Sequence, residues 1–344
     1  MERGGSPAYV CPDGAHWGQP PPAMTAHSAT IDVCIVGAGP AGLNAALVLG
    51  RCGRSVVVYD SGQPRNAASQ GLRCFLSRDG INPHELRAIG RLEVGAYPSV
   101  TFIDAQVVAA KRSPYGFELV TSDGQSRACR ILLLATGRVD VLPDRPGFRE
   151  LYGRGVHHCP YCDGWEHRGQ RIVAYGEYPA VADLALALLT WTPRVTVVVP
   201  EPGQASADDR RRLGEQRIEV APADIASVEG TPEGGVTGAQ LANGERIACD
   251  AVFFTSALPQ RSALAENLGC EMDDGGSVVC RAHAATGVPG LYVAGNVRGG
   301  VHLAIMAAAE GAEAAIAINE ELADNGLNPT EAVRPRQPTS GGDA

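Results

Sequence analysis

The stretch Ile31-Asp32-Val33-Cys34-Ile35-Val36-Gly37-Ala38-Gly39-Pro40-Ala41-Gly42 decides the fold of this chain. Its first six residues form a β-rich run, and an Ala/Leu-rich helical pattern follows the glycines to about Gly50. In such a turn Gly37 allows a tight bend, Gly39 lets the backbone approach a pyrophosphate, and Gly42 lets the helix pack closely on the strand. The stretch therefore predicts a strand, a phosphate-binding turn and a helix.

A second β-rich run, residues 55–59, ends at Asp60. A carboxylate about 20 residues after the glycine turn can bond to an adenosine ribose hydroxyl. With a strand before the glycines and a helix after them, Asp60 makes a dinucleotide site the favoured interpretation. Residues 62–80, rich in glycine and polar residues, are expected to form a loop at that ligand; a solvated loop is the alternative.

The length and composition limit the class of protein. A chain of 344 residues exceeds one ordinary core, so two domains are expected. The formal net charge of −9 disfavours a nucleic-acid partner. No apolar run reaches the roughly 18 to 20 residues of a membrane span. Ten irregularly spaced cysteines do not suggest a secreted disulfide framework. We therefore expect a soluble cytoplasmic protein without membrane contact.

The order of the motifs predicts an α/β fold of two Rossmann-like three-layer domains. Residues 131–134 read as a buried parallel strand that ends in Ala135-Thr136-Gly137. A second strand–turn–helix unit starts near residue 172, and Gly290–Asn296 precedes a long helical pattern over residues 301–322. We expect a first domain made of residues 30–147 and 283–324, interrupted by an inserted domain of residues 148–282. Residues 1–29 and 325–344, rich in Gly and Pro, are expected to be disordered.

The inserted domain opens with a pair of cysteines, in His157-His158-Cys159-Pro160-Tyr161-Cys162-Asp163-Gly164. Two thiols separated by two residues can close a disulfide and exchange it, and the adjacent Asp163 can carry protons. The alternatives are a structural disulfide or half of a zinc site. A zinc site would need a second ligand pair, and no second C-x-x-C exists in the chain.

Together these motifs resemble the low-molecular-weight thioredoxin reductase family, from about residue 31 to residue 322. The resemblance implies FAD bound by the split first domain, a redox disulfide facing the flavin, and a homodimer. It also implies that Cys162 lies nearest the flavin and that Cys159 meets the substrate thiol. The implied cofactor-binding residues are Gly37, Gly39, Pro40, Ala41, Gly42, Asp60, Ser61, Arg65, Asn66, Ala135, Thr136, Gly137, Gly295 and Asn296.

The inserted domain departs from the family where NADPH should bind. A second G-x-G-x-x-A/G is replaced by Gly176-Glu177-Tyr178-Pro179-Ala180-Val181, and the next strand ends in Pro200-Glu201-Pro202. Bulk at Tyr178 and charge at Glu177 disfavour a pyrophosphate there. We therefore expect no NADPH site; the alternative is a divergent site that takes NADH through Glu201.

A redox disulfide without a nicotinamide site is expected to oxidise thiols and pass the electrons to oxygen. The chain resembles the sulfur-bridge-forming dithiol oxidases of the gliotoxin, holomycin and romidepsin type. That resemblance implies a small-molecule dithiol as substrate, O2 as acceptor and H2O2 as product. Two departures are Arg73-Cys74 before Phe75, where His-Gly is common, and Asn296 in place of an aspartate.

The general base is not decided by the sequence. Asp163 and His158 lie closest to the cysteines in sequence, and His302 precedes the last helix; a packed or solvent-exposed imidazole is the alternative for each histidine. Tyr161 and Trp165 could line an entrance for an apolar molecule or be structural. The rival functions are an NAD(P)H-dependent thioredoxin reductase and a redox-sensing flavoprotein without turnover.

Overall fold

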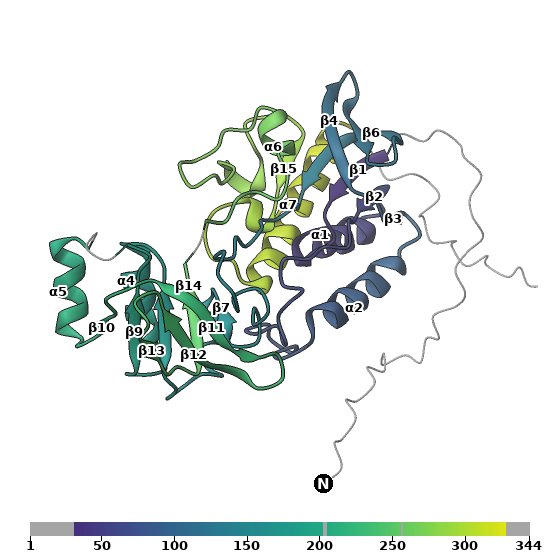
Figure 1. Cartoon of the computed structure of the whole chain (residues 1–344). Helices are drawn as coiled ribbons and strands as arrows, with labels where there is room; N and C mark the ends of the chain where they lie inside the picture. Colours follow the sequence, from purple (N-terminus) through teal and green to yellow (C-terminus); the bar gives the residue numbers. More distant parts are fainter. Residues whose placement is uncertain (1–30, 202–204, 256, 328–344) are drawn as a thin grey trace, which may run out of the picture.

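The computed structural model describes residues 31–201, 205–255 and 257–327, which form two α/β units (Figure 1). The expectation of two Rossmann-like domains is confirmed by their parallel sheets. Residues 1–29 lie outside the described part. The expected disorder from residue 325 onward is wrong for residues 325–327, because Leu327 packs on the first core and its carbonyl accepts a hydrogen bond from Arg54. Residues 328–344 lie outside the described part.

The first unit is built on a sheet in the order β3-β2-β1-β6-β5-β4, with β15 also paired to β6. Its central strands are parallel, and β4, β5 and β6 are antiparallel. Side chains of β1 alternate between two cores: Val33 and Ile35 point to one, and Cys34 and Val36 to the other. Burial on both faces explains the unbroken apolar run of this strand. The strands are β1 (Ile31–Val36), β2 (Val56–Tyr59), β3 (Val100–Ile103), β4 (Val107–Ser113), β5 (Gly116–Thr121), β6 (Ser126–Leu134) and β15 (Leu291–Val293).

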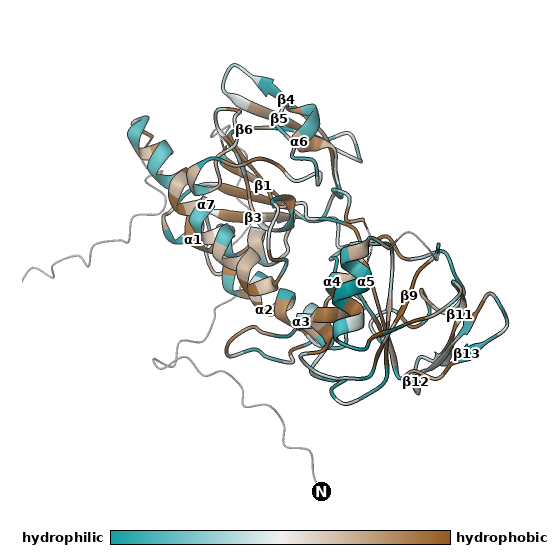
Figure 2. Cartoon of the chain, turned by 90° about the vertical axis from the view of Figure 1, so that its left-hand side faces the viewer, coloured by the Kyte–Doolittle hydropathy of each residue, from teal (hydrophilic) through white to brown (hydrophobic). Residues whose placement is uncertain are grey.

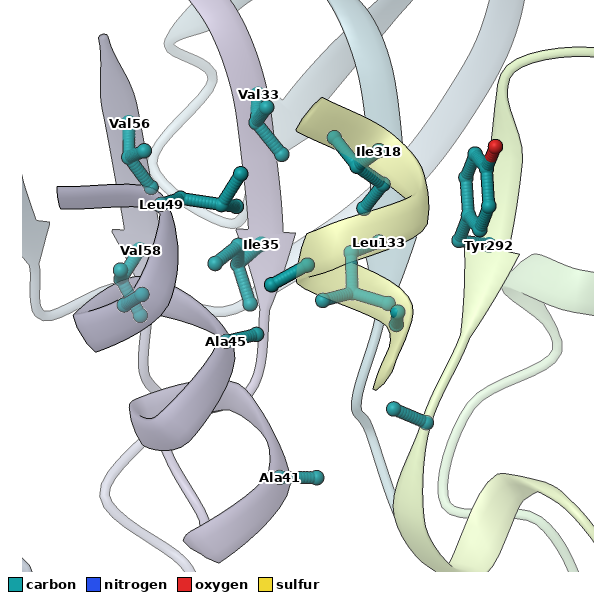
Figure 3. Packing of buried hydrophobic residues seen from close by; sticks show 14 of the residues in the cluster. Val33, Ile35, Ala41, Ala45, Leu49, Val56, Val58, Leu133, Tyr292 and Ile318 are labelled. Atoms are coloured by element: carbon teal, nitrogen blue, oxygen red, sulfur yellow. The ribbon is translucent and has the colours of Figure 1, made fainter. Parts of the chain in front are cut away.

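The longer helices of the first unit are α1 (Pro40–Arg51), α2 (Pro83–Gly95) and α7 (Ala304–Asp324). Figure 3 shows α1 and α7 meeting over the sheet through small side chains, with Ala41 and Ala45 on α1. A Cβ at Gly311 of α7 would collide with the carbonyl oxygen of Ala41. Glycine and alanine therefore allow these two helices to approach closely.

The inserted unit has a parallel sheet in the order β10-β9-β8-β14-β7 and a separate antiparallel sheet in the order β11-β12-β13. Apolar residues concentrate in its strands, whereas the outer helix α5 is largely hydrophilic (Figure 2). Within the described residues no helix is both long and apolar enough to cross a bilayer. The elements are β7 (Val156–His157), β8 (Ile172–Tyr175), α4 (Ala180–Leu188), β9 (Val195–Val198), α5 (Ala207–Glu215), β10 (Glu219–Val220), β11 (Ile225–Thr231), β12 (Gly235–Leu241), β13 (Arg246–Ile247) and β14 (Ala251–Phe254).

The chain crosses between the units at other points than the expected residues 147 and 283. The two crossings run side by side, since Arg138 pairs with Gln260 and the amide of Val139 donates to the carbonyl of Pro259. Leu142 packs on the core of the inserted unit, whereas the helix α6 (Leu264–Asn267) packs in the core of the first. The expected boundaries are wrong because composition marks loops, while side-chain packing decides which core a segment joins.

Candidate active site

The glycine turn has the geometry that a pyrophosphate requires. Gly37 has φ +110°, and a Cβ there would collide with the carbonyl oxygen of Ala135. A Cβ at Gly42 would collide with the carbonyl oxygen of Gly37, so strand and helix meet only because both are glycine. No heavy atom lies within 4 Å of a Cβ built at Gly39. Gly39 caps α1 without a side-chain hydrogen bond, which leaves first-turn N–H groups for an anion.

A pocket extends from this turn to Cys162 of the cysteine pair. Ligand-site residues predicted from the sequence line it from both units, whereas Gly42 and Cys159 are absent from its wall. Its lining, from a glycine turn to a disulfide sulfur, fits FAD. The predicted residues on the wall are Gly37, Gly39, Pro40, Ala41, Asp60, Ser61, Arg65, Asn66, Ala135, Thr136, Gly137, His158, Cys162, Asp163, Gly295, Asn296 and His302.

Asp60 lies at the nucleotide end of the pocket and is held by two arginines. One carboxylate oxygen accepts from the amide of Gly62 at 3.0 Å. The other accepts from Arg87 at 2.6 Å and from Arg91 at 3.0 Å. Asp60, which is predicted to bind the ribose, therefore also forms ion pairs with Arg87 and Arg91. Arg87, which also lines the pocket, carries no motif that identifies it in the sequence.

Cys159 and Cys162 form a disulfide, with Cα atoms 5.3 Å apart. They flank the start of the short helix α3 (Pro160–Asp163), and only Cys162 reaches the pocket wall. Asp163 also lies on that wall. Tyr161 and Trp165 are 68% and 63% exposed on the outer side of the pair. The two sulfur atoms are thus placed unequally, one toward the pocket and one away from its wall.

A buried polar cluster joins the two units beside the disulfide. Arg65, from the first unit, donates to a carboxylate oxygen of Asp140 at 2.8 and 2.5 Å and contacts Nε2 of His158 at 2.9 Å. Tyr152 donates its hydroxyl proton to Asp140, and its oxygen lies 2.9 Å from Nδ1 of His158. Because Arg65 can only donate, Nε2 of His158 accepts and Nδ1 carries the proton. Both nitrogens of His158 are therefore occupied, and neither is open to a thiol.

Burial and charge set the protonation of this cluster. Burial by itself raises the pKa of Asp140, but hydrogen bonds from Arg65 and the charge of His158 lower it overall. Burial lowers the pKa of His158, and Asp140 offsets only part of that effect. Burial, with Asp140 adding to it, raises the pKa of Tyr152. At neutral pH the cluster is an ionised Arg65–Asp140 pair with a neutral imidazole and phenol.

His302 is on the pocket wall just before α7, as the sequence suggested. Its Nε2 is buried and has no hydrogen-bond partner among the described residues. Burial, and then the positive charges of Arg65 and Arg138, lower its pKa. An unpaired polar atom in a pocket wall is an expected feature of a site that holds a polar ligand.

Sequence reasoning missed Arg138, Asp140 and Tyr152, which all line the pocket. Arg138 is buried and donates to the backbone carbonyl of Asn296 at 2.8 Å. These residues follow no known spacing, and their partners are distant in the sequence. The one available signal was their position around the crossing between the domains. In the described part of the chain no group of three or more His, Cys, Asp or Glu side chains could hold a metal ion.

Comparison with known proteins agrees with this geometry. The profile of the pyridine nucleotide-disulphide oxidoreductase family matches residues 31–311. Thioredoxin reductase tcpT of Claviceps purpurea is 32% identical over 289 residues, covering 77% of this chain and 86% of that protein. A protein of Arthroderma benhamiae is 36% identical over 165 residues, but the match spans only 46% of this chain and 41% of that protein.

A similar solved structure is that of HlmI, with 35% identity and a TM-score of 0.84. The match covers 89% of this chain and 96% of HlmI, so both units are shared. Members of the matched family are flavoproteins that bind FAD, and the pocket described above has the residues for it. The chain therefore belongs to the pyridine nucleotide-disulphide oxidoreductase family and is a thioredoxin reductase-like flavoenzyme.

Proposed function

We propose that this enzyme is an FAD-dependent dithiol oxidase that closes an intramolecular disulfide in a small-molecule dithiol. Oxygen is the terminal acceptor and hydrogen peroxide the product. The observation that carries the proposal is the pairing of a disulfide at an FAD-type pocket with a second nucleotide loop that its own side chains fill. In this proposal electrons enter from thiols, because the bulk of Tyr178 and the charge of Glu177 disfavour a nicotinamide cofactor at that loop.

The filled loop lies between β8 and α4 of the inserted unit. Tyr178 packs against the core formed by α4 and the adjacent strands, and burial raises the pKa of its phenol. Val181 is fully buried at the position where the family motif has a small residue. A pyrophosphate at this turn would need an open backbone at the position of Tyr178. It would also need close packing of helix on strand at the position of Val181. Glu177 adds a negative charge beside the same position.

FAD, when bound, accepts two electrons from a dithiol and passes them to oxygen. The chain supplies its binding site with residues from both units. The turn at Gly37, Gly39 and Ala41 would hold the pyrophosphate, and Asp60 would hold the adenosine ribose. The far end of the pocket, with Cys162 on its wall, would receive the reactive ring system.

The protein's own chemistry is two consecutive thiol–disulfide exchanges. A substrate thiol loses its proton, and the thiolate attacks the sulfur of Cys159; the Cys159–Cys162 bond breaks and Cys162 leaves as a thiolate. The second substrate thiolate attacks the substrate sulfur of the mixed disulfide, and Cys159 leaves. The substrate loses two protons and two electrons, and the cysteine pair gains the electrons. Asp163 is the better placed base, because both nitrogens of His158 are occupied.

The remaining partners follow from the surface. The formal net charge of −9 supports a small molecule rather than a nucleic acid as partner. Tyr161 and Trp165 offer exposed aromatic surface beside the disulfide for an apolar substrate. We also propose a homodimer, in which the helical layer of the first unit covers its exposed apolar side chains. The rival function, reduction of thioredoxin with NADPH, is favoured by the name of the Claviceps purpurea relative.

The deciding experiment is an anaerobic titration of the flavin absorbance with NADPH, NADH and dithiothreitol, each in a separate sample, followed by air. Bleaching by dithiothreitol alone, with recovery and peroxide release in air, is the expected result. Rapid bleaching by NADPH would contradict the proposal and identify a reductase. Cys159→Ser and Cys162→Ser should each abolish turnover and retain the bound flavin, whereas a redox sensor without turnover would release no peroxide.

A further inference from the structure

Two histidines lead from Asp163 to the protein surface: His157 also lines the pocket, whereas His167 does not. His157, the last residue of β7, is buried and places Nδ1 3.4 Å from a carboxylate oxygen of Asp163. Nε2 of His157 lies 3.0 Å from Nε2 of His167, and Nδ1 of His167 lies 2.7 Å from Oε1 of the exposed Gln170. The line therefore extends from the pocket wall to the protein surface.

The hydrogen bonds determine which nitrogen of His157 carries the proton. The backbone amide of Gly155 donates to Nε2 of His157 at 3.1 Å. An amide N–H cannot accept, so Nε2 presents its lone pair, and a neutral His157 carries its proton on Nδ1. That nitrogen faces Asp163. The rings of His157 and Phe253 have centroids 5.3 Å apart, and this packing restricts the orientation of the imidazole.

The contact with His167 favours the same tautomer of His157. Because Nε2 of His157 is an acceptor, Nε2 of His167 must donate to it. Its second nitrogen then meets Gln170, whose amide can present either its oxygen or its NH2 group. Burial lowers the pKa of His167, while the hydrogen bond to Gln170 opposes that change. His167 can thus change protonation while its bond to His157 is kept.

We propose that His157 is a positioning residue for disulfide exchange, holding the Asp163 carboxylate beside Cys162 through an N–H group on Nδ1. His167 supports this tautomer and connects the line to solvent. The inference rests on the proposed function, because it assigns to Asp163 the proton from the substrate thiol. Neither histidine enters the exchange itself, and neither belongs to the buried Arg65–Asp140 cluster.

Other charged groups around Asp163 enter any dependence on pH. Besides His157, three groups interact electrostatically with Asp163: His158 directly after β7, His167 in the segment after α3, and Tyr152 in the loop before β7. His158 and Tyr152 are neutral near pH 7 by the pKa shifts given above. The acid limb of a pH profile reports these groups together, so the contrast between two substitutions of His157 is needed to isolate the Asp163 contact.

The test compares two substitutions that keep different atoms of the imidazole. The amide nitrogen of His157→Asn can occupy the place of Nδ1, whereas the amide of His157→Gln reaches the place of Nε2. The rate of flavin bleaching by dithiothreitol is measured without oxygen between pH 5 and 9, with His283→Gln as an exposed-histidine control. His157→Asn should stay within about threefold of the wild type. His157→Gln should be slower by about 10- to 100-fold, with its acid limb at higher pH.

The opposite order would overturn the proposal: a fast His157→Gln and a slow His157→Asn would show that His157 only anchors the Gly155 amide. A second measurement needs no turnover. Long-range ¹⁵N–¹H spectra of the histidine rings, assigned by loss of signals in His157→Asn, should show His157 protonated on Nδ1, and protonation on Nε2 would also overturn the proposal. If dithiothreitol bleaches the flavin but air releases no peroxide, only the oxidase function fails. If the wild-type flavin is not bleached, both fail.

Discussion

At the scale of single residues, we expect the stability of the fold to depend strongly on Asp140. Its side chain is 5% exposed and neutralises Arg65, which is 14% exposed. Removing one partner of a buried pair leaves the other charge without compensation. We expect Asp140→Asn to lower the free energy of unfolding by about 3 kcal/mol, measured by urea denaturation of the flavin-loaded protein.

The matched control for this change is Glu229→Gln, which removes the carboxylate of the exposed Arg246–Glu229 pair. Exposed pairs contribute about 0.2–1 kcal/mol, so the control should stay close to the wild type. An equal loss in both variants would show that burial of Asp140 does not determine its contribution.

Three histidines make stability depend on pH. Burial lowers the pKa of His158, His167 and His302 below 6.5. Since the unfolded chain binds protons more readily than the folded chain, their stabilisation is present above about pH 6.5 and is lost as the pH falls through the folded values. In urea titrations between pH 5 and 8, His302→Gln should reduce the slope of the free energy of unfolding against pH by up to about 1.4 kcal/mol per pH unit. The exposed His283→Gln should leave the slope unchanged, and a steeper slope in His302→Gln would contradict the argument.

At the scale of elements, the contact of α1 with α7 depends on Gly311. Alanine is a better helix former than glycine by about 1 kcal/mol, but its Cβ would collide with the carbonyl of Ala41. We expect Gly311→Ala to destabilise the protein by about 1–3 kcal/mol in urea denaturation, and to weaken flavin binding because α1 carries the glycine turn.

Gly214 in α5 provides the comparison, since a Cβ added there would meet no heavy atom within 4 Å. Gly214→Ala should be neutral or stabilising by up to about 1 kcal/mol. A loss of stability in Gly214→Ala as large as in Gly311→Ala would mean that packing of α7 against α1 is not the cause.

At the scale of the whole molecule, the first unit exposes apolar side chains on its helical layer. Leu92 of α2 is 78% exposed and Ile316 of α7 is 52% exposed. If the proposed homodimer covers them, sedimentation should give twice the chain mass of 35.8 kDa. Leu92→Glu and Ile316→Glu should weaken the dimer, because each places a charge in an apolar contact. Val220→Glu, on the inserted unit, should not; a monomeric wild type would contradict the dimer.

Local sequence was sufficient for the elements that are defined over a few residues. The glycine turn at Gly37 needs only backbone conformation and absent Cβ atoms, and the C-x-x-C pair needs only two intervening residues. The long apolar or alternating runs likewise predicted the strands and α7 near their observed ends. The predicted crossing points were wrong because Leu142 packs on the core of the inserted unit and α6 packs in the core of the first. Which core a segment joins depends on three-dimensional packing.

The sequence by itself thus determined that this protein joins an FAD-type turn to a C-x-x-C pair, because each of these motifs consists of contiguous residues. Only the tertiary structure decided how protons are held around that disulfide. Arg65 and Asp140 are 75 residues apart, and the pairing of His157 with Asp163 is informative only once the amide of Gly155 fixes the tautomer. Hydrogen-bond direction and burial set the charge of each group, and neither exists until the two units have folded against each other.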